Sequence, residues 1–218
     1  MLEKMSEFFE NRLDSYDNHM LTEIEKADEF YPFTASLLPK DENAKILDLG
    51  CGTGLELEFY FPLNPAAKIT GIDLSKGMLN AMREKFPYKN ISLICGSYFD
   101  VPFGENAFDA AVSVESLHHF TAEEKRPLYE KLYRALKKGG YFILTDYLCK
   151  TDEEEKLYRE AYLNQQKEQG ISDNEFYHYD TPLTFEHEIE VLKKAGFSSV
   201  KVLGNWENTY TIKAVKYI

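Results

Sequence analysis

The chain has 218 residues and a formal net charge of −12, from 25 Lys and Arg against 37 Asp and Glu. Its length suits one α/β domain, and 44% hydrophobic residues suffice for a core, which argues against disorder. The negative charge disfavours capture of a nucleic-acid backbone. No apolar run approaches the roughly 18 residues of a membrane span, and the acidic N-terminus is unlike a signal peptide. We therefore expect a cytoplasmic protein without nucleic-acid or membrane partners.

Cysteine usage points to the same compartment. The three cysteines, Cys51, Cys95 and Cys149, are odd in number, widely spaced and form no CxxC pair. They fit reducing surroundings and supply neither a disulfide framework nor a structural zinc site. No close set of Asp, Asn and His recurs at ligand spacing, so the sequence predicts no metal site.

The acidic excess lies in the two flanks of the chain. Residues 1–43 hold 4 basic and 11 acidic side chains, residues 44–150 hold 13 of each, and residues 151–218 hold 8 and 13. The first flank has the pattern of one or two amphipathic helices that end near Pro39. The balanced middle is therefore distinct from an acidic segment on each side.

The middle segment alternates short apolar runs with helical patterns. Five runs are continuous in apolar residues, as parallel strands covered on both faces require: residues 44–50, 67–73, 91–96, 108–115 and 140–147. Helical spacing covers 75–86 and 121–140, with Ser75 and Thr121 as N-caps and Gly139 and Gly140 as stops. This alternation predicts a doubly wound parallel sheet with right-handed crossovers.

The C-terminal flank adds two helices and a hairpin. A charged helix is expected over 151–170, with its apolar stripe formed by Leu157, Tyr158, Ala161 and Tyr162. A second helix covers 184–196. The runs 197–204 and 209–218, separated by the polar turn "NWEN", predict an antiparallel hairpin.

Three alternating glycines follow the first apolar strand, in "ILDLGCGTGLE". They place Asp48, Gly50, Gly52 and Gly54 at the carboxyl end of that strand, where open α/β sheets bind ligands. A tight turn that needs glycine only for its backbone angles is the alternative. The alternation after so apolar a strand favours a ligand-binding loop.

Two classes of ligand compete for this loop. A dinucleotide fold needs G-x-G-x-x-G, with pyrophosphate at the helix N-terminus. Here Leu55 stands where the last of those glycines belongs, and Asp48 would face a pyrophosphate with like charge. A ligand with an ammonium group and no phosphate removes both objections.

Four motifs, in their expected order and spacing, resemble those of the class I S-adenosylmethionine-dependent methyltransferases. "DLGCGTG" is similar to the family's glycine-rich motif and "GIDLS" to its acidic second-strand motif. "GSYFDVPFGENAFDAAVSVESLHHF" resembles the stretch that contacts adenine and ends at the fourth strand, and "RALKKGGYFILTD" the approach to the fifth. The resemblance covers residues 40–150 and, more loosely, the whole chain.

The resemblance implies a Rossmann-like, doubly wound, seven-stranded α/β sheet, mostly parallel with an antiparallel C-terminal hairpin, plus helical cap elements. It also implies a single methyltransferase domain over residues 1–218. The expected parts are an N-terminal helical cap at 1–43, a cofactor-binding core at 44–150, a cap insertion at 151–182, and the last crossover helix with the hairpin at 183–218.

The implied methyl donor is S-adenosyl-L-methionine, with S-adenosyl-L-homocysteine as product. The resemblance gives Asp48 the methionine ammonium and gives Asp73 both ribose hydroxyls, a bidentate task that suits a carboxylate. Backbone approach is assigned to the loop residues Gly50, Cys51, Gly52 and Gly54. Further cofactor contacts are expected near the adenine, the methionine portion and the cap, from Leu74, Met78, Ser97, Tyr98, Phe99, Val114, Glu115, Tyr16 and Arg12.

One position departs from the family pattern. Ser97 stands where the family usually has Asp, so the usual side-chain bond to the adenine amino group is replaced. Either the shorter Ser97 hydroxyl or the backbone of Tyr98 and Phe99 takes that role.

Candidates for the reacting end follow the fourth and fifth strands and lie in the C-terminal segment. Methyl transfer from a sulfonium is an in-line displacement in which positioning is the main task, and a general base is needed only for a protonated acceptor. The candidate catalytic residues are His118 and His119, and the candidate substrate-binding residues are Tyr147 and His178. Packing or helix capping is the alternative role for each histidine.

The sequence thus predicts a methyltransferase that acts on a small-molecule acceptor, as a monomer or homodimer. A NAD-dependent oxidoreductase and a non-catalytic S-adenosylmethionine-binding module are the alternatives. A nucleic-acid acceptor is disfavoured because "VESL" replaces the "NPPY"-like tetrapeptide after the fourth strand. The acidic flanks suggest a neutral or cationic acceptor such as an amine, with solvated helix surface as the other explanation of their charge.

Overall fold

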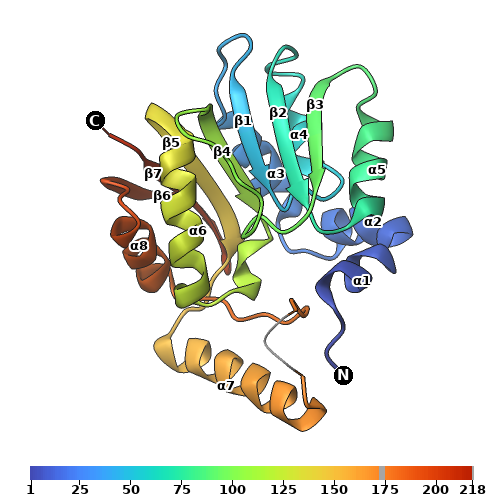
Figure 1. Ribbon diagram of the computed structural model, residues 1–218, viewed down its shortest axis with the longest axis vertical. Helices are drawn as coiled ribbons and strands as arrows, with labels where there is room; N and C mark the ends of the chain where they lie inside the picture. The colour runs from blue at the N-terminus through green and yellow to red at the C-terminus, as the bar shows by residue number, and fades with distance from the viewer. Residues whose placement is uncertain (172–174, 218) are drawn as a thin grey trace.

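Seven strands form one central sheet in the computed structural model, which describes residues 1–171 and 175–217 (Figure 1). The strands are β1 (Lys45–Leu49), β2 (Lys68–Asp73), β3 (Asn90–Cys95), β4 (Phe108–Val114), β5 (Leu136–Tyr147), β6 (Ser199–Trp206) and β7 (Thr209–Val215). Their order is β3-β2-β1-β4-β5-β7-β6, with β1 to β5 parallel and β7 antiparallel to both β5 and β6. The predicted doubly wound sheet with a C-terminal hairpin is confirmed.

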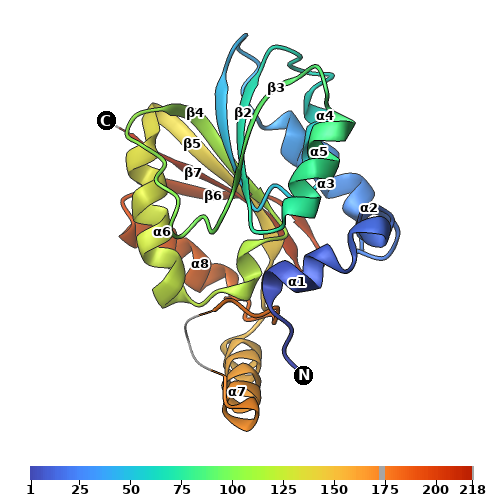
Figure 2. The same cartoon turned by 45° about the vertical axis from the view of Figure 1, so that its right-hand side comes forward.

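Helices cover both faces of this sheet (Figure 2). On one face lie α3 (Ala27–Ser36), α4 (Leu55–Tyr60) and α5 (Lys76–Lys85), which share an apolar cluster with β1 and β2. On the other lie α6 (Ala122–Ala135) and α8 (Phe185–Lys194), whose apolar side chains pack in a second cluster. Each crossover therefore carries the chain back to the edge where the next parallel strand starts, and β1, β2, β4 and β5 all end at the opposite edge.

Three more helices lie beyond that edge. α1 (Met5–Glu10) and α2 (Leu13–Thr22) come from the N-terminal flank, and α7 (Asp152–Gln169) follows β5. Figure 1 shows α7 projecting away from the sheet, and none of its residues is buried; Leu157 of the predicted stripe is 64% exposed. No helix among the described residues combines the length and apolar character that crossing a bilayer needs.

Helix starts were predicted correctly where a side chain caps the backbone. The Ser75 hydroxyl accepts from the Met78 N–H at the start of α5. Thr121 accepts from the Glu124 N–H, and the Glu124 carboxylate accepts in return from the Thr121 N–H, which completes a capping box at the start of α6.

The helix predicted over 121–140 is wrong at its C-terminal end. α6 ends at Ala135 and β5 begins at Leu136. Gly139 and Gly140 lie where β5 shifts its register against β4. Gly139 has a φ of 78°, and a Cβ on Gly140 would stand 2.9 Å from the Lys137 carbonyl oxygen. These glycines therefore permit a strand irregularity and do not stop a helix.

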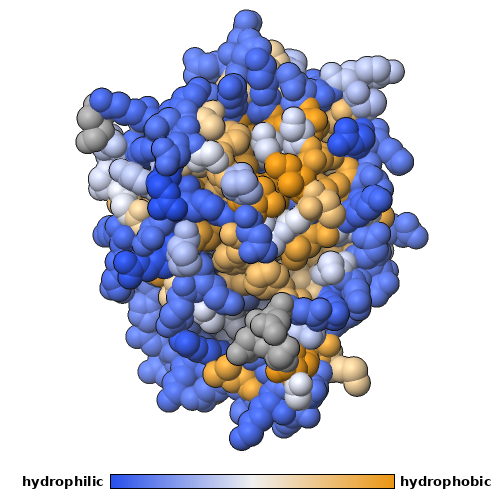
Figure 3. All heavy atoms as spheres, viewed as in Figure 1, coloured by the Kyte–Doolittle hydropathy of each residue, from blue (hydrophilic) through white to orange (hydrophobic). Residues whose placement is uncertain are grey.

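Two other expectations are also wrong. The first flank folds into three helices, because α3 is separate from α1 and α2. β3 is not covered on both faces: Ile94 is 37% exposed, since residues 96–107 cross to β4 without forming a helix. Figure 3 shows apolar side chains gathered near the middle of this face, between α6 and α5.

A buried ion pair joins α6 to α8. Lys125 Nζ donates to Glu188 Oε2 at 2.6 Å, and both side chains are fully buried. The Tyr129 hydroxyl donates to the other carboxylate oxygen of Glu188. Removal of one charge leaves the other without its counter-ion in a medium of low dielectric constant.

We expect Lys125→Met to lower the free energy of unfolding by about 3–5 kcal/mol, because Glu188 is left buried and unpaired. The double variant Lys125→Met/Glu188→Gln removes both charges, keeps an acceptor for Tyr129 and should recover most of that loss. Urea denaturation followed by circular dichroism measures both. Equal losses in the two variants would contradict the argument.

Candidate functional site

The glycine loop joins β1 to α4. Gly50, Gly52 and Gly54 all have positive φ angles, of 69°, 49° and 74°. A Cβ on Gly50 would stand 2.0 Å from Oγ of Ser116, so the loop after β4 approaches too closely for any other residue. The Cys51 side chain is buried against β2, where its Sγ lies 2.8 Å from where a Cβ on Gly71 would stand. The backbone here is thus held against the ends of the neighbouring strands.

Two acidic side chains are buried together beside this loop. Asp48, in β1, is 1% exposed, and Glu56, in the first turn of α4, is 4% exposed. Burial, and for Asp48 also the neighbouring Glu56, raises the pKa of both carboxyl groups above their ordinary values. Asp48 Oδ2 and Glu56 Oε1 have no hydrogen-bond partner among the described residues. A buried cation would satisfy both oxygens.

Asp73 ends β2 and organises the adjoining turns. Its two carboxylate oxygens accept from the N–H groups of Gly52 at 2.9 Å and Ser75 at 2.8 Å. Burial raises the pKa of Asp73, and these backbone donors oppose that rise. Glu10 of α1 reaches the same corner, where it accepts from the Ser75 hydroxyl at 2.7 Å and the Gly77 N–H at 3.0 Å. The N-terminal flank is therefore fastened beside Asp73.

The residues expected near the adenine follow β2 and β3, which end side by side. Met78 is buried in the first turn of α5, and Leu74 is partly buried against the core. The Ser97 hydroxyl accepts from the Phe99 N–H at 3.1 Å. Tyr98 is buried, and its hydroxyl donates to a carbonyl in the loop after β4 at 3.3 Å. The Ser97 hydroxyl thus gives one acceptor site to its own turn and keeps its O–H donor and a second lone pair.

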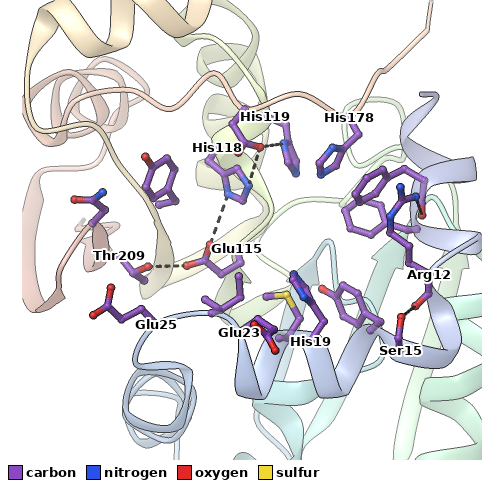
Figure 4. A pocket seen from close by; sticks show the side chains of 18 of the residues that line it. Arg12, Ser15, His19, Glu23, Glu25, Glu115, His118, His119, His178 and Thr209 are labelled. Atoms are coloured by element: carbon purple, nitrogen blue, oxygen red, sulfur yellow. Dashed lines mark hydrogen bonds and ion pairs between the residues drawn. The ribbon is translucent and has the colours of Figure 1, made fainter. Parts of the chain in front are cut away.

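A cavity of about 960 Å³ lies between the N-terminal helices and the ends of β4, β5 and β7 (Figure 4). The predicted site residues that line it are Arg12, Tyr16, Glu115, His118, His119, Tyr147 and His178. The Tyr16 hydroxyl also lies 3.8 Å from where a Cβ on Gly52 would stand. Tyr16 therefore separates this cavity from the glycine loop. Val114, buried at the end of β4, lies under the same region.

Arg12 borders the cavity but is held by α1. Its Nη1 donates to the Glu3 carboxylate at 3.2 Å and to the Phe8 carbonyl at 2.9 Å, and its guanidinium stacks 3.6 Å above the Phe8 ring. The cofactor contact expected of Arg12 therefore needs the guanidinium donors on Nη2 or Nε, or release of Nη1 from Glu3.

His118 lies on η1 (Leu117–His119), a short turn after β4, and is oriented by Asp146 of β5. His118 Nδ1 is 2.5 Å from Oδ1 of Asp146, whose other oxygen accepts from the Leu117 N–H at 2.8 Å. Glu115 approaches the same ring at 3.9 Å and accepts from the Thr209 hydroxyl at 3.0 Å (Figure 4). His118 Nε2 is left facing the cavity and Asp180, with 3.6 Å between Nε2 and Oδ1.

The charges around His118 shift its titration. Burial alone would lower the pKa of His118, but Asp146, Asp180 and Glu115 outweigh it and raise that pKa to about 9. Burial, followed by the Asp146 carboxylate, raises the pKa of Glu115 to about 7. At neutral pH His118 is therefore an imidazolium paired with Asp146.

The other two predicted histidines lie beside His118. His119 Nδ1 is 3.1 Å from Asp180 Oδ1, and its ring centroid is 4.7 Å from that of His178. His178 stacks on Phe8 at 3.5 Å. Burial, and next the charge of His118, lowers the pKa of His119, while burial and His119 lower that of His178 to about 4. Tyr147 closes this side, with its hydroxyl 3.1 Å from that of Tyr158.

Two overlapping groups around His118 have ligand atoms close enough for a metal ion. Each brings one atom per residue within 4.8 Å: His118, His119 and Asp180, and Glu115, His118 and Asp146. Both contain carboxylates beside nitrogen ligands, so they favour a positively charged group.

Glu10 and Glu56 belong to the site but were not predicted from the sequence. Glu56 lies in the first turn of a helix, where acidic residues are common because of the helix dipole. The sequence around Glu56 therefore does not indicate that its side chain is buried. Glu10 is one acid among many in an amphipathic flank. Glu10 acts through Ser75 and Gly77, which are distant along the chain, and Glu56 acts through Asp48 on the other side of the glycine loop.

We expect histidine NMR signals to separate these roles. His118 should titrate near pH 9 and His178 near pH 4, because carboxylates stabilise the first imidazolium and burial destabilises the second. Asp146→Asn should move the His118 midpoint down toward its ordinary value of about 6.5. Assignment by single His→Asn variants gives the control, and a His118 midpoint below about 6.5 in the unsubstituted protein would overturn this account.

Comparison with known proteins identifies the core. Residues 46–140 match the family model described as a methyltransferase domain. The chain is 25% identical over 226 residues to a carboxy-S-adenosyl-L-methionine synthase of Nitratiruptor sp., in an alignment that covers 99% of this chain and 95% of that protein. It is 34% identical over 136 residues to a Xenopus tropicalis protein, tRNA (carboxymethyluridine(34)-5-O)-methyltransferase alkbh8, covering 62% of this chain and 20% of that protein.

Solved structures share the fold. Human N-acetylserotonin methyltransferase, in complex with S-adenosylmethionine, matches with a TM-score of 0.63 at 21% identity, covering 88% of this chain and 53% of that chain. The YcgJ protein from Bacillus subtilis matches with a TM-score of 0.65 at 14% identity, covering 86% and 98%. Residues 46–140 of the chain therefore form a methyltransferase domain, with S-adenosylmethionine as its cofactor.

Proposed function

We propose that this methyltransferase transfers a methyl group to a small molecule held in the cavity beside His118. The observation that carries the proposal is the buried Asp48 and Glu56 pair, whose unpartnered oxygens lie beside the glycine loop while a separate cavity opens on the other side of Tyr16. When bound, S-adenosylmethionine supplies an electrophilic methyl group on a sulfonium. A two-part site of this kind fits one cationic donor and one small acceptor.

The chain's own residues fit that donor. Asp48 and Glu56 present carboxyl oxygens to its ammonium group, and Asp73 presents two to the ribose hydroxyls. Gly50, Cys51, Gly52 and Gly54 let the backbone approach, while Leu74, Met78 and Tyr98 supply apolar surface for the adenine. Tyr16 and Arg12 close the site from the N-terminal flank. In-line displacement then depends on how firmly these contacts orient the reactants.

The cavity favours a small acceptor over a macromolecular one. It is bounded by α1, α2, η1 and the β6–β7 turn, and its lining is acidic. A polyanion such as the tRNA named for the Xenopus relative would meet like charge there. The proposal includes a monomer or homodimer as the working form, and light scattering distinguishes the two.

The Nitratiruptor relative is named for a different product, a carboxylated S-adenosylmethionine, so synthesis of that product is an alternative function for this chain. Such a reaction adds a carboxylate to the bound donor and calls for a free cation beside it. Arg12 is the one Lys or Arg among the described lining residues, and it is paired with Glu3. The geometry therefore favours methyl transfer.

A nicotinamide cofactor fits this loop less well. Leu55 and the buried Asp48 stand where a dinucleotide site needs glycine and no negative charge. A thermal shift with NAD and none with S-adenosylhomocysteine would favour an oxidoreductase over a methyltransferase. Binding of S-adenosylhomocysteine without methylation of any metabolite in a panel would favour a non-catalytic binding module.

We expect S-adenosylhomocysteine to bind with a micromolar dissociation constant by calorimetry, and Asp73→Asn to weaken it at least about 100-fold, because two charge-assisted hydrogen bonds are lost. Glu84→Gln, an exposed acid on the helix that follows Asp73, is the matched control and should bind normally. No measurable heat with the unsubstituted protein would end the proposal.

A second binding experiment isolates the buried carboxyl pair. Glu56→Gln should weaken S-adenosylhomocysteine about 10-fold to 100-fold, since it removes a charged partner of the ammonium group, but should leave adenosine binding unchanged. Adenosine lacks the amino-acid portion and is the internal control. Equal weakening of both ligands would show that Glu56 only supports the fold.

A further inference from the structure

We propose that the methyl acceptor is a small organic amine, which binds as its ammonium ion against Asp180 and Glu115 and gives its proton to His118. This inference rests on the proposed methyl transfer in the same cavity and adds the chemical class of the substrate.

The cavity wall carries far more negative than positive charge. Its carboxylates come from separate segments of the chain and are Glu23, Glu25, Glu115, Asp180 and Glu207. Against them stand Arg12, already paired with Glu3 at 3.2 Å, and the imidazolium of His118. An entering carboxylate or phosphate is repelled by this wall, whereas an ammonium ion is attracted.

The strongest part of this field surrounds His118. Glu115, Asp146 and Asp180 all approach that one imidazolium, while the lowered pKa values of His119 and His178 keep those two rings neutral. Asp146, Asp180 and the carboxyl group of Glu115, which is about half ionised at neutral pH because its pKa is about 7, thus face a single positive ring. The cluster has a net negative charge at neutral pH, and a further cation reduces it.

The bound cofactor leaves the carboxylates around His118 available to a second cation. Its ammonium and ribose face a different set of acids, Asp48, Glu56 and Asp73, which are not among the residues that line the cavity. Asp180 in particular lies on the segment after α7 and has a side chain that is 44% exposed. It stays open toward the cavity for a second positively charged group.

Aromatic rings complete a site for an organic cation. Phe9, Tyr16, Tyr147 and Trp206 all border the cavity. Trp206 is held in place, because its indole N–H donates to Glu29 at 3.1 Å and its ring packs edge-on against Phe33. Ring faces attract cations and also bury apolar carbon, so the wall suits an amine with an apolar or aromatic body.

The geometry of His118 suits proton removal from such a substrate. Two cations entering beside its imidazolium, the acceptor ammonium and the donor sulfonium, disfavour the charged ring, so His118 first releases its Nε2 proton to water. Asp146 holds Nδ1 at 2.5 Å, so the neutral ring keeps its proton on Nδ1 and turns a free Nε2 to the cavity.

Proton transfer and methyl transfer then follow in order. The ammonium gives one proton to Nε2 of His118, and the freed nitrogen lone pair forms a bond to the methyl carbon. The carbon–sulfur bond breaks with its electron pair staying on sulfur. The products are the methylated ammonium ion and S-adenosylhomocysteine, and the proton on His118 passes to water.

The first test compares probes of matched size. Phenethylamine and histamine are offered to the protein with S-adenosylmethionine, beside 2-phenylethanol and 3-phenylpropanoate. Mass spectrometry detects methylated product, and calorimetry on the protein loaded with S-adenosylhomocysteine measures binding of each probe without turnover. We expect the amines to bind at least about ten times more tightly than the alcohol, and the carboxylate not to bind.

The second test removes one negative charge from the cavity wall. Asp180→Asn keeps an acceptor for His119 but removes the charge, and should weaken amine binding at least about 10-fold while S-adenosylhomocysteine binds as before. Glu160→Gln, an exposed acid on α7 away from the cavity, is the matched control and should change neither.

The outcomes separate the two proposals. If S-adenosylhomocysteine binds but the alcohol or carboxylate is preferred, or if Zn²⁺ binds to this wall and no amine does, the amine inference is overturned and methyl transfer stands. If S-adenosylhomocysteine does not bind, the proposed function itself fails. Amine binding that is insensitive to Asp180→Asn also overturns the inference.

Discussion

Four parallel strands bring carboxylates to one edge of the sheet, and the rest of the site depends on how those charges are balanced. The residues at or next to the ends of β1, β2, β4 and β5 are Asp48, Asp73, Glu115 and Asp146. A carboxylate removed from water is costly unless it is paired or hydrogen-bonded. Backbone N–H groups satisfy Asp73, His118 satisfies Asp146, and Thr209 serves Glu115. Asp48 Oδ2 has no hydrogen-bond partner among the described residues, and the neighbouring Glu56 is another acid.

The N-terminal flank divides this edge into two compartments. Glu10 fastens α1 at Ser75 and Gly77, and Asp17 of α2 accepts from the hydroxyl of Thr53 in the glycine loop. This attachment also fixes the position of Tyr16. Tyr16 precedes Asp17 on α2, so its side chain lies beside Gly52. The same contacts that fix the flank therefore separate the acids near the glycine loop from those around His118.

The sequence predicts the parts of the molecule that local chemistry determines. Apolar runs, capping residues and three alternating glycines locate most of the sheet and the glycine loop, because each depends on neighbours a few residues away. The prediction for Gly139 and Gly140 was wrong because glycine serves both helix ends and strand irregularities, and only the register against β4 separates them. Glu56 could not be recognised, since its burial depends on packing against Asp48.

The acceptor side is harder to predict for a related reason. His118 follows directly from its place after β4, but Asp180 reaches it from a segment about sixty residues later, beyond α7. What composition does carry is the sign of the charge. Four of the five lining carboxylates, Glu23, Glu25, Asp180 and Glu207, belong to the two acidic flanks, whereas the acids at the start of α7 remain on the surface. The excess charge is thus partly exposed to solvent and partly directed into the cavity, and the part in the cavity is the basis of the proposed preference for an amine acceptor.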